Sequence, residues 1–93
     1  MTNNPKDFKI LERILKGAAN SWRIRILFIL KDSPDLSLID ISEKLKMNFK
    51  NASEHIRKLA IAGLVSKKYD GIFVRHRLTD RGNNILTFCR MLE

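Results

Sequence analysis

The sequence has little of what several protein classes require. Its 93 residues include one cysteine and two histidines, too few for an internal disulfide framework or a zinc ligand set of the usual spacing. Two prolines and four glycines leave no low-complexity tract. No nucleophile elbow, phosphate-binding loop or metal signature surrounds the serine, histidine and aspartate residues. We therefore expect no enzyme, no metal and no cofactor.

Long hydrophobic runs are also missing. No apolar stretch approaches the roughly 18 residues that a membrane-spanning helix needs, and the beginning, MTNNPKDFKI, lacks the apolar segment of a signal peptide. We expect a cytoplasmic protein that does not enter the membrane. With 44% hydrophobic and 30% charged residues, the composition is that of one soluble domain with a single core.

Positive charge is abundant and unevenly distributed. The net charge is +8, with seven Lys/Arg against six Asp/Glu in residues 1–43, ten against three in residues 44–81, and one of each in residues 82–93. The excess falls almost wholly within 44–81, as expected for a surface that meets a polyanion. A solvated basic face without a ligand remains the alternative on charge alone.

Capping residues and apolar periodicity predict three helices in the first half. One amphipathic helix is expected from a cap at Asn4 to Gly17, and a second from a cap at Asn20 to Lys31. SLID, residues 37–40, has the form of a capping box and opens a third helix to about residue 46. The second helix is too apolar for the surface and should lie in the core. Its apolar residues are Trp22, Ile26, Leu27, Ile29 and Leu30.

The stretch NFKNASEHIRKLAIAGLV, residues 48–65, predicts a fourth helix with two unlike faces. At 100° per residue, the core face holds Phe49, Ala52, Ile56, Leu59 and Ala60. The opposite face is polar and mostly basic, with Lys50, Glu54, Arg57 and Lys58, and with Asn51 and His55 at its flanks. Phe49 is expected to turn inward, and Gly63 to end the helix as its C′ residue.

Two strands and a last helix complete the predicted elements. LVSKKY, residues 64–69, and FVRHRL, residues 73–78, flank Asp70-Gly71, a dipeptide favoured in type I′ hairpin turns. Strand alternation places His76 on the inward face beside Val74 and Leu78. After LTDRG, apolar residues at helical spacing predict a helix over residues 83–92.

This order of elements predicts a mainly α fold with a small β-hairpin. Two helices joined by a short turn, the second with an exposed polar face, and then a basic hairpin are typical of a winged helix-turn-helix, whose second helix enters the major groove of DNA. We expect the helix-turn-helix at 38–62 and the wing at 64–78, within a single domain, 1–93, that has additional N- and C-terminal helices.

Double-stranded DNA is therefore the expected partner, and twelve residues are candidates to contact it. Those in the first turns of the fourth helix, Lys50, Asn51, Glu54 and His55, are placed to meet base edges. The others are expected to hold phosphates or the minor groove. The complete set is Asn48, Lys50, Asn51, Ser53, Glu54, His55, Arg57, Lys58, Lys67, Lys68, Arg75 and Arg77.

The end helices, within 1–17 and 80–93, carry apolar stripes that need a partner. A homodimer formed through them would set two recognition helices about 34 Å apart, one turn of DNA; packing within a monomer is the alternative. Cys89 is expected to be an inert packed thiol, with a redox switch or an interchain disulfide as the alternative. The candidate interface residues are Phe8, Leu11, Ile14, Leu15, Ile85, Phe88, Cys89 and Leu92.

Three segments resemble the DNA-binding core of ArsR-like winged-helix transcriptional regulators: AANSWRIRILFIL (18–30), LIDISEKLKMNFKNASEHIRKLAIAGLV (38–65) and VRHRLTDRG (74–82). Ser53, His55, Ile56 and Leu59, followed by AGLV, look like the recognition helix of that family, while LTDRG is similar to MarR-type regulators. The resemblance implies a homodimer that represses a promoter from a palindromic operator and is released by an effector, which the sequence does not identify. The paired cysteines of metal-sensing members are missing from LIDISEKL, so the metal switch does not carry over.

A second hypothesis is a winged-helix interaction module that binds a protein partner or structured RNA, its basic face being incidental. Reversing the charges at Lys50, Lys58, Lys67 and Arg77 distinguishes the two hypotheses. The reversal should abolish DNA binding under the first and leave partner binding largely intact under the second.

Overall fold

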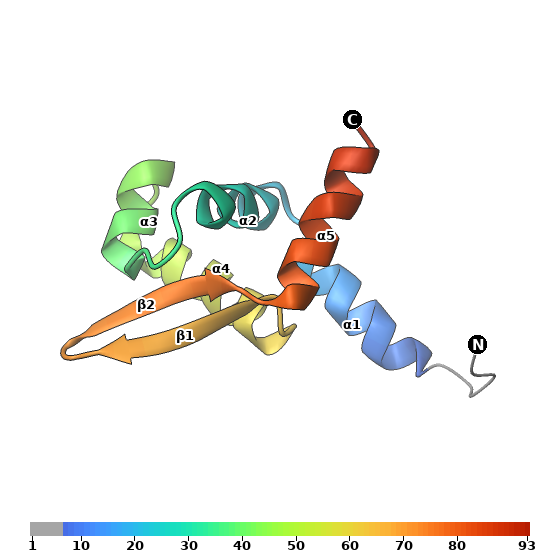
Figure 1. Cartoon of the computed structure of the whole chain (residues 1–93), viewed down its shortest axis with the longest axis horizontal. Helices are drawn as coiled ribbons and strands as arrows, with labels where there is room; N and C mark the ends of the chain where they lie inside the picture. Colours follow the sequence, from blue (N-terminus) through green and yellow to red (C-terminus); the bar gives the residue numbers. More distant parts are fainter. Residues whose placement is uncertain (1–6) are drawn as a thin grey trace.

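The computed structural model describes residues 7–93, which form five helices and one antiparallel hairpin. In chain order the elements are α1 (Phe8–Ala18), α2 (Ser21–Asp32), α3 (Leu38–Leu45), α4 (Phe49–Ile61), β1 (Val65–Asp70), β2 (Phe73–Leu78) and α5 (Asp80–Met91). The molecule measures 44 × 31 × 21 Å, and the hairpin turn projects at the end opposite to α1 and α5 (Figure 1). No helix within residues 7–93 has the length and apolar character to cross a membrane.

The second helix lies at the centre of the core, as predicted. The side chain of Asn20 caps it by accepting hydrogen bonds from the backbone N–H groups of Trp22 and Arg23, at 2.9 and 3.2 Å. Trp22 itself is more than a third exposed, with the Arg25 guanidinium 4.8 Å from its ring centroid, so its predicted place in the core is wrong. It lies one residue off the i, i+3, i+4, i+7 stripe that faces inward. The buried apolar residues of that stripe are Ile26, Leu27 and Leu30.

The link between α3 and α4 is three residues long, 46–48. The predicted capping box is confirmed: Ser37 Oγ accepts from the backbone N–H of Asp40, and the Asp40 carboxylate accepts from that of Ser37, both at 3.2 Å. Lys46, with φ +53°, ends α3 in the left-handed region. Asn48 then caps α4 by accepting a 2.7 Å hydrogen bond from the Asn51 N–H. The two helices are thus held in a compact helix-turn-helix.

The end of α4 is also as predicted. Gly63 has φ +76°, its N–H donates to the Ala60 carbonyl (3.0 Å), and the Leu64 N–H donates to the Leu59 carbonyl (2.9 Å). These two hydrogen bonds form a Schellman motif, in which a left-handed C′ residue satisfies the last carbonyls of a helix. Gly63 therefore directs the chain from the recognition helix straight into the hairpin.

Ala52, Ile56 and Leu59 anchor α4 in the core, as predicted, but Phe49 does not. The ring of Phe49 is 53% exposed, so the prediction that it turns inward is wrong. As the first residue of α4 it lies at the edge of the core-facing stripe, where the packing against α3 ends. It instead lines an open hollow together with residues of α3 and of the hairpin.

The hairpin turn lies one residue further along than predicted. Asp70 pairs with Phe73, which leaves Gly71 and Ile72 as the two-residue loop. Gly71 has φ +62°, whereas Ile72 is not among the residues with positive φ; this pattern is that of a type II′ turn. The predicted type I′ turn at Asp70-Gly71 is wrong, since it would need Asp70 in a left-handed conformation that a glycine adopts at less cost.

The last helix begins at Asp80, three residues before its predicted start. Thr79 caps it, with Oγ1 accepting a 3.0 Å hydrogen bond from the Gly82 N–H. LTDRG is therefore a cap and a first helical turn, and its glycine packs closely against the backbone of Leu64, just before β1. The first helix begins at Phe8, capped by Asp7, whose carboxylate accepts from the N–H groups of Lys9 and Ile10. The cap predicted at Asn4 lies outside the described residues.

Candidate nucleic-acid interface

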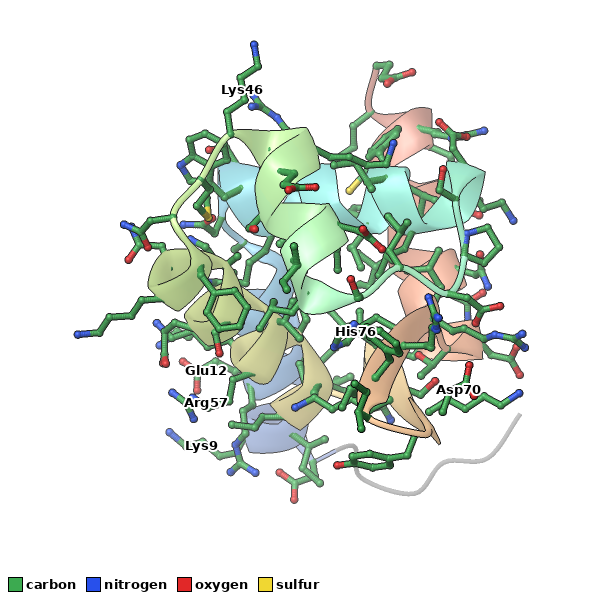
Figure 2. The ribbon with its side chains drawn as sticks, turned by 90° about the vertical axis from the view of Figure 1, so that its left-hand side faces the viewer. Lys9, Glu12, Lys46, Arg57, Asp70 and His76 are labelled. Carbon is green, nitrogen blue, oxygen red and sulfur yellow. The ribbon has the colours of Figure 1, made fainter. Side chains whose placement is uncertain are left out.

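The outward face of α4 is basic and contains one internal ion pair. Lys50 and Lys58 are exposed, and neither forms a salt bridge within residues 7–93. Arg57, which projects from α4 into solvent (Figure 2), pairs with the carboxylate of Glu54 one turn before it. Hydrogen bonding from Arg57 lowers the pKa of Glu54. Glu54, the one acidic candidate for DNA contact, is therefore ionised and already paired with Arg57.

His55 has one ring nitrogen engaged inside the protein. Its Nδ1 lies 3.2 Å from Nη1 of Arg23 in α2, and because a guanidinium only donates, this nitrogen accepts and the proton sits on Nε2. Burial and then the charge of Arg23 lower the pKa of His55. Of the four residues expected at base edges, Lys50, Asn51 and Glu54 are exposed, whereas His55 is half-buried.

The sequence reasoning missed Arg23, the buried cation beside His55. Arg23 is 8% exposed, and its Nε and Nη2 donate to the carbonyls of Gly17 (2.6 Å) and Lys16 (3.3 Å). It thus satisfies carbonyls in the last turn of α1 while it contacts the recognition helix. Its burial could have been predicted from the sequence, because Arg23 begins the inward-facing stripe that continues through Ile26, Leu27 and Leu30.

Within residues 7–93, the hairpin carries two lysines without ion pairs and two arginines that contact aspartates. Lys67 and Lys68 are exposed and make no salt bridge within the described chain. Arg77 is bound by Asp35 in the α2–α3 link, its Nη2 lying 2.9 Å from Oδ2, and this hydrogen bonding lowers the pKa of Asp35. Arg75 Nη1 donates to the Asp35 carbonyl (3.4 Å), and its Nε lies 3.6 Å from the Asp70 carboxylate. The two wing arginines are therefore held in place and partly neutralised.

His76 anchors the hairpin to the rest of the domain. It is 2% exposed, as its predicted inward face requires, and Figure 2 shows it within the molecule. Its Nδ1 donates to the Leu36 carbonyl (2.9 Å), its backbone N–H donates to the same carbonyl (3.0 Å), and its carbonyl accepts from the Asp35 N–H (3.0 Å). Burial lowers the pKa of His76. The wing is thus fixed relative to the helix-turn-helix.

Ser53 and Asn48 have more limited roles than the lysines. The carbonyl oxygen of the Asn48 side chain is occupied in capping α4, and Ser53 is half-buried beside the hollow that Phe49 lines. Among residues 7–93, no three side chains of His, Cys, Asp or Glu gather closely enough to hold a metal ion.

The end helices expose apolar side chains at the other end of the molecule. Leu15 of α1 and Phe88 of α5 are 54% and 51% exposed, and both line a hollow of about 230 Å³ in which Ile85, Cys89 and Leu92 also lie. Phe8 and Leu11 are exposed as well, while Ile14, Ile85 and Cys89 are half-buried. Five of the eight predicted interface residues therefore line one open apolar hollow: Leu15, Ile85, Phe88, Cys89 and Leu92.

A basic recognition helix, a two-stranded wing fixed beside it and a capped three-residue link define a winged helix-turn-helix protein. The family described as bacterial regulatory protein, arsR family, matches residues 20–67. The chain belongs to this family, whose fold is that of winged-helix DNA-binding transcription regulators.

Solved structures have the same fold. Reduced HlyU from Vibrio cholerae is 28% identical, with a TM-score of 0.75 over 91% of this chain and 90% of its own. A homodimeric winged helix-turn-helix DNA-binding domain from Mycobacterium bovis, a possible ArsR-family transcriptional regulator, has a TM-score of 0.83 at 21% identity, covering 98% of this chain and 89% of that one. The multiple antibiotic-resistance repressor from Listeria monocytogenes has a TM-score of 0.71 at 16% identity, covering 82% of this chain and 53% of its own.

Proposed function

We propose that the protein is a cytoplasmic transcriptional repressor that binds a palindromic operator as a homodimer. The observation that carries this proposal is the exposed basic face, in which α4 presents Lys50 and Lys58, and the adjacent wing presents Lys67 and Lys68, without internal partners in the described chain. Such cations meet phosphates and lower the free energy of binding through counterion release.

Lys50, Asn51 and Glu54 are proposed to contact base edges, because the N-terminal part of a recognition helix lies deepest in the major groove. Asn51 can pair bidentately with adenine, and Lys50 can donate to guanine. His55 is proposed to hold α4 in position through its hydrogen bond with Arg23 of α2. Ser53, Arg57 and Lys58, with the wing residues Lys67, Lys68, Arg75 and Arg77, are proposed to hold the backbone.

The dimer is proposed to form through α1 and α5, which together line one apolar hollow that exposes Leu15 and Phe88. This hollow lies at the end opposite to the wing turn (Figure 1), so pairing two copies there leaves both basic faces open. A twofold axis through such an interface requires an operator with inverted half-sites. The homodimeric state of the Mycobacterium bovis domain supports a dimer of this fold.

Selection of bound sequences from a random duplex pool tests the proposal. We expect enrichment of an inverted repeat, and repression of a reporter promoter that contains it. The variant Lys50→Glu should abolish binding to the enriched duplex, whereas Lys9→Glu, an equal change in charge on α1, should retain it. Equal, salt-sensitive binding of the repeat and of random duplex would exclude sequence-specific regulation and favour an interaction module for a protein or structured RNA.

A further inference from the structure

Phe49 places an exposed aromatic ring in the first turn of the recognition helix. It directly follows the capping residue Asn48 and precedes Lys50 in the helix. Other apolar residues of α4, such as Ala52 and Leu59, are fully buried. Phe49 is 53% exposed, although a phenyl ring is the kind of group that folding normally removes from water. The position and the exposure together suggest contact with a ligand of the helix.

Phe49 lies beside a group of exposed apolar side chains, at the edge between the core-facing stripe and the basic face of α4. Phe49 borders an open hollow of about 300 Å³, to which Ile39 of α3 and Tyr69, Ile72 and Phe73 of the hairpin also contribute. All four of those side chains are half or more exposed. Single exposed apolar residues are ordinary, but a contiguous group of them marks an interaction surface. This group joins the first turn of α4 to α3 and the hairpin, and α4 and the hairpin are the elements proposed to contact DNA.

The chemistry of the major groove supplies a matching group. Base pairs present hydrogen-bond donors and acceptors along their major-groove edges, and their one apolar substituent is the C5-methyl group of thymine. A phenyl ring offers no hydrogen bond to a base edge, so its favourable contact there is with this methyl. Because the N-terminal turn of a recognition helix lies deepest in the groove, Phe49 reaches the bases before later residues of α4 do.

We propose that Phe49 is a specificity-determining residue that recognises a thymine methyl group in each half-site. This inference rests on the proposed operator binding. It assigns thymine to the base pair nearest the N-terminus of α4, beside the pairs that Lys50 and Asn51 contact. It also accounts for an exposed aromatic ring among the cations and amides of a reading surface.

Substitution of deoxyuridine for thymine tests the inference, because it removes only the methyl group. Each thymine of the selected operator is replaced in turn, and equilibrium dissociation constants are measured by fluorescence anisotropy. We expect one position per half-site at which the substitution weakens binding of the wild-type protein by roughly fourfold, the effect of one buried methyl group. Replacement in both half-sites should weaken binding by about fifteenfold, the product of the two effects.

The same measurement on variants identifies the contacting residue. Phe49→Ala should bind thymine and deoxyuridine operators equally, and Phe49→Leu should keep part of the discrimination. Ile61→Ala is the matched control, because Ile61 is 63% exposed and is the last residue of the same helix, about 18 Å further along the axis. Its ratio of dissociation constants for the deoxyuridine and thymine operators should equal that of the wild type. Circular dichroism establishes that each variant is folded.

Two results would overturn the assignment while the proposed function stands. One is specific operator binding that is insensitive to deoxyuridine at every thymine. The other is a deoxyuridine effect of unchanged size in Phe49→Ala. If the pool selection enriches no operator, the result contradicts both the proposed function and this inference.

Discussion

Asp35 controls how much positive charge the wing offers to DNA. Its carboxylate holds Arg77, and its backbone carbonyl accepts from Arg75. Asp35 also has φ +70°, a left-handed conformation in which aspartate and asparagine are the commonest residues after glycine. Asp35 thus has two roles: its backbone adopts a left-handed conformation, and its carboxylate pairs with Arg77. A substitution can remove the second role and keep the first.

We predict that Asp35→Asn increases both the affinity for random duplex and its salt dependence. Asparagine keeps the left-handed backbone but releases Arg77 for a phosphate, so the slope of log K against log salt should steepen by about 0.9 per protomer. The measurement is a salt titration of binding to a nonspecific duplex. Asp32→Asn is the control, since Asp32 is exposed at the end of α2 and makes no ion pair in the described chain. Equal slopes in the two variants would show that Arg77 does not face phosphates.

We also predict that the protein loses stability as the pH falls below about 6.5, the usual histidine pKa. Burial lowers the pKa values of both His76 and His55 in the folded state. Between the unfolded and the folded pKa values, only the unfolded chain binds the proton, so the free energy of unfolding decreases with falling pH. Each histidine contributes a slope of at most about 1.4 kcal/mol per pH unit.

Urea denaturation between pH 8 and pH 5 measures this effect. The free energy of unfolding should be level above pH 7 and decline below it. The double variant His55→Gln/His76→Gln should lose the decline, and His55→Gln alone should keep the part due to His76. The carboxyl groups of Asp35, Asp40 and Glu54, whose pKa values are lowered, stay ionised throughout this range. A decline of the same size in the double variant would contradict the assignment.

Residues whose roles are local were predictable from the sequence. The caps at Asn20 and Ser37 and the left-handed Gly63 each depend on a few neighbouring residues, so residue type and spacing predict them. The exposure of Phe49 was not predictable, because it depends on where α3 and the hairpin stop covering α4. The helical projection describes one helix and contains no information about the extent of its neighbours.

At the scale of elements, the contact between α5 and the residues that join α4 to β1 fixes how the C-terminal helix leaves the wing. Gly82 is buried in the first turn of α5, and a Cβ atom there would lie 2.1 Å from the carbonyl oxygen of Leu64. Thr79 adds two hydrogen bonds at the same corner, from its N–H to that oxygen (3.1 Å) and from its hydroxyl to the Gly63 carbonyl (2.6 Å). The helix therefore approaches the backbone of Leu64, just before β1, as closely as a glycine allows.

We predict that Gly82→Ala destabilises the protein by about 1–3 kcal/mol or more, the usual cost of an overpacked site. The obstructing atoms belong to backbone, so they cannot move aside as a flexible side chain would. Thermal or urea unfolding measures the loss. Asn84→Ala, an exposed position on the same helix, should change the free energy of unfolding by no more than about 0.5 kcal/mol. Equal stabilities of the two variants would contradict the close contact.

Element types and order were predicted correctly, and the errors fall at two boundaries. A glycine in LTDRG suggested a link, because glycine is unfavourable within helices, yet here Gly82 is retained inside α5 for close packing. Asp70-Gly71 suggested a type I′ turn, yet the strand register places Gly71 first in the loop. The two errors have different origins: a close contact with the Leu64 backbone keeps Gly82 inside α5, whereas the pairing of Asp70 with Phe73 sets the place of Gly71 in the loop.

At the scale of the whole molecule, the two ends have different surfaces. The hairpin and α4 carry exposed lysines, whereas α1 and α5, which lie away from the hairpin turn (Figure 1), expose Leu15 and Phe88. Leu15 and Phe88 come from these two helices and line the same hollow. The sequence indicated both apolar stripes but not that they would contribute to one hollow, because that depends on how α1 and α5 pack around α2.

We predict that Phe88→Glu converts the proposed dimer into a monomer and weakens operator binding to the level of a single half-site. A carboxylate buried in an apolar interface would lose its hydration without gaining a partner. Sedimentation equilibrium measures the assembly. Thr87→Glu is the control, because it places the same charge on the adjacent residue, on the side of α5 opposite to Cys89. A wild-type monomer, or a dimer that survives Phe88→Glu, would place the interface elsewhere.

Arg23 links the two ends of the molecule through one side chain. Its guanidinium holds the last turn of α1 and the ring of His55 in the recognition helix simultaneously. A displacement of α1 by more than about an ångström would stretch the two bonds to its carbonyls beyond hydrogen-bond length. Within residues 7–93, His55 would then be the one remaining acceptor of a buried cation, which is costly. In the proposed dimer, the distance between the two α4 helices is therefore fixed to within the tolerance of a hydrogen bond. An operator whose half-sites are one base pair further apart must bend or twist to be bound.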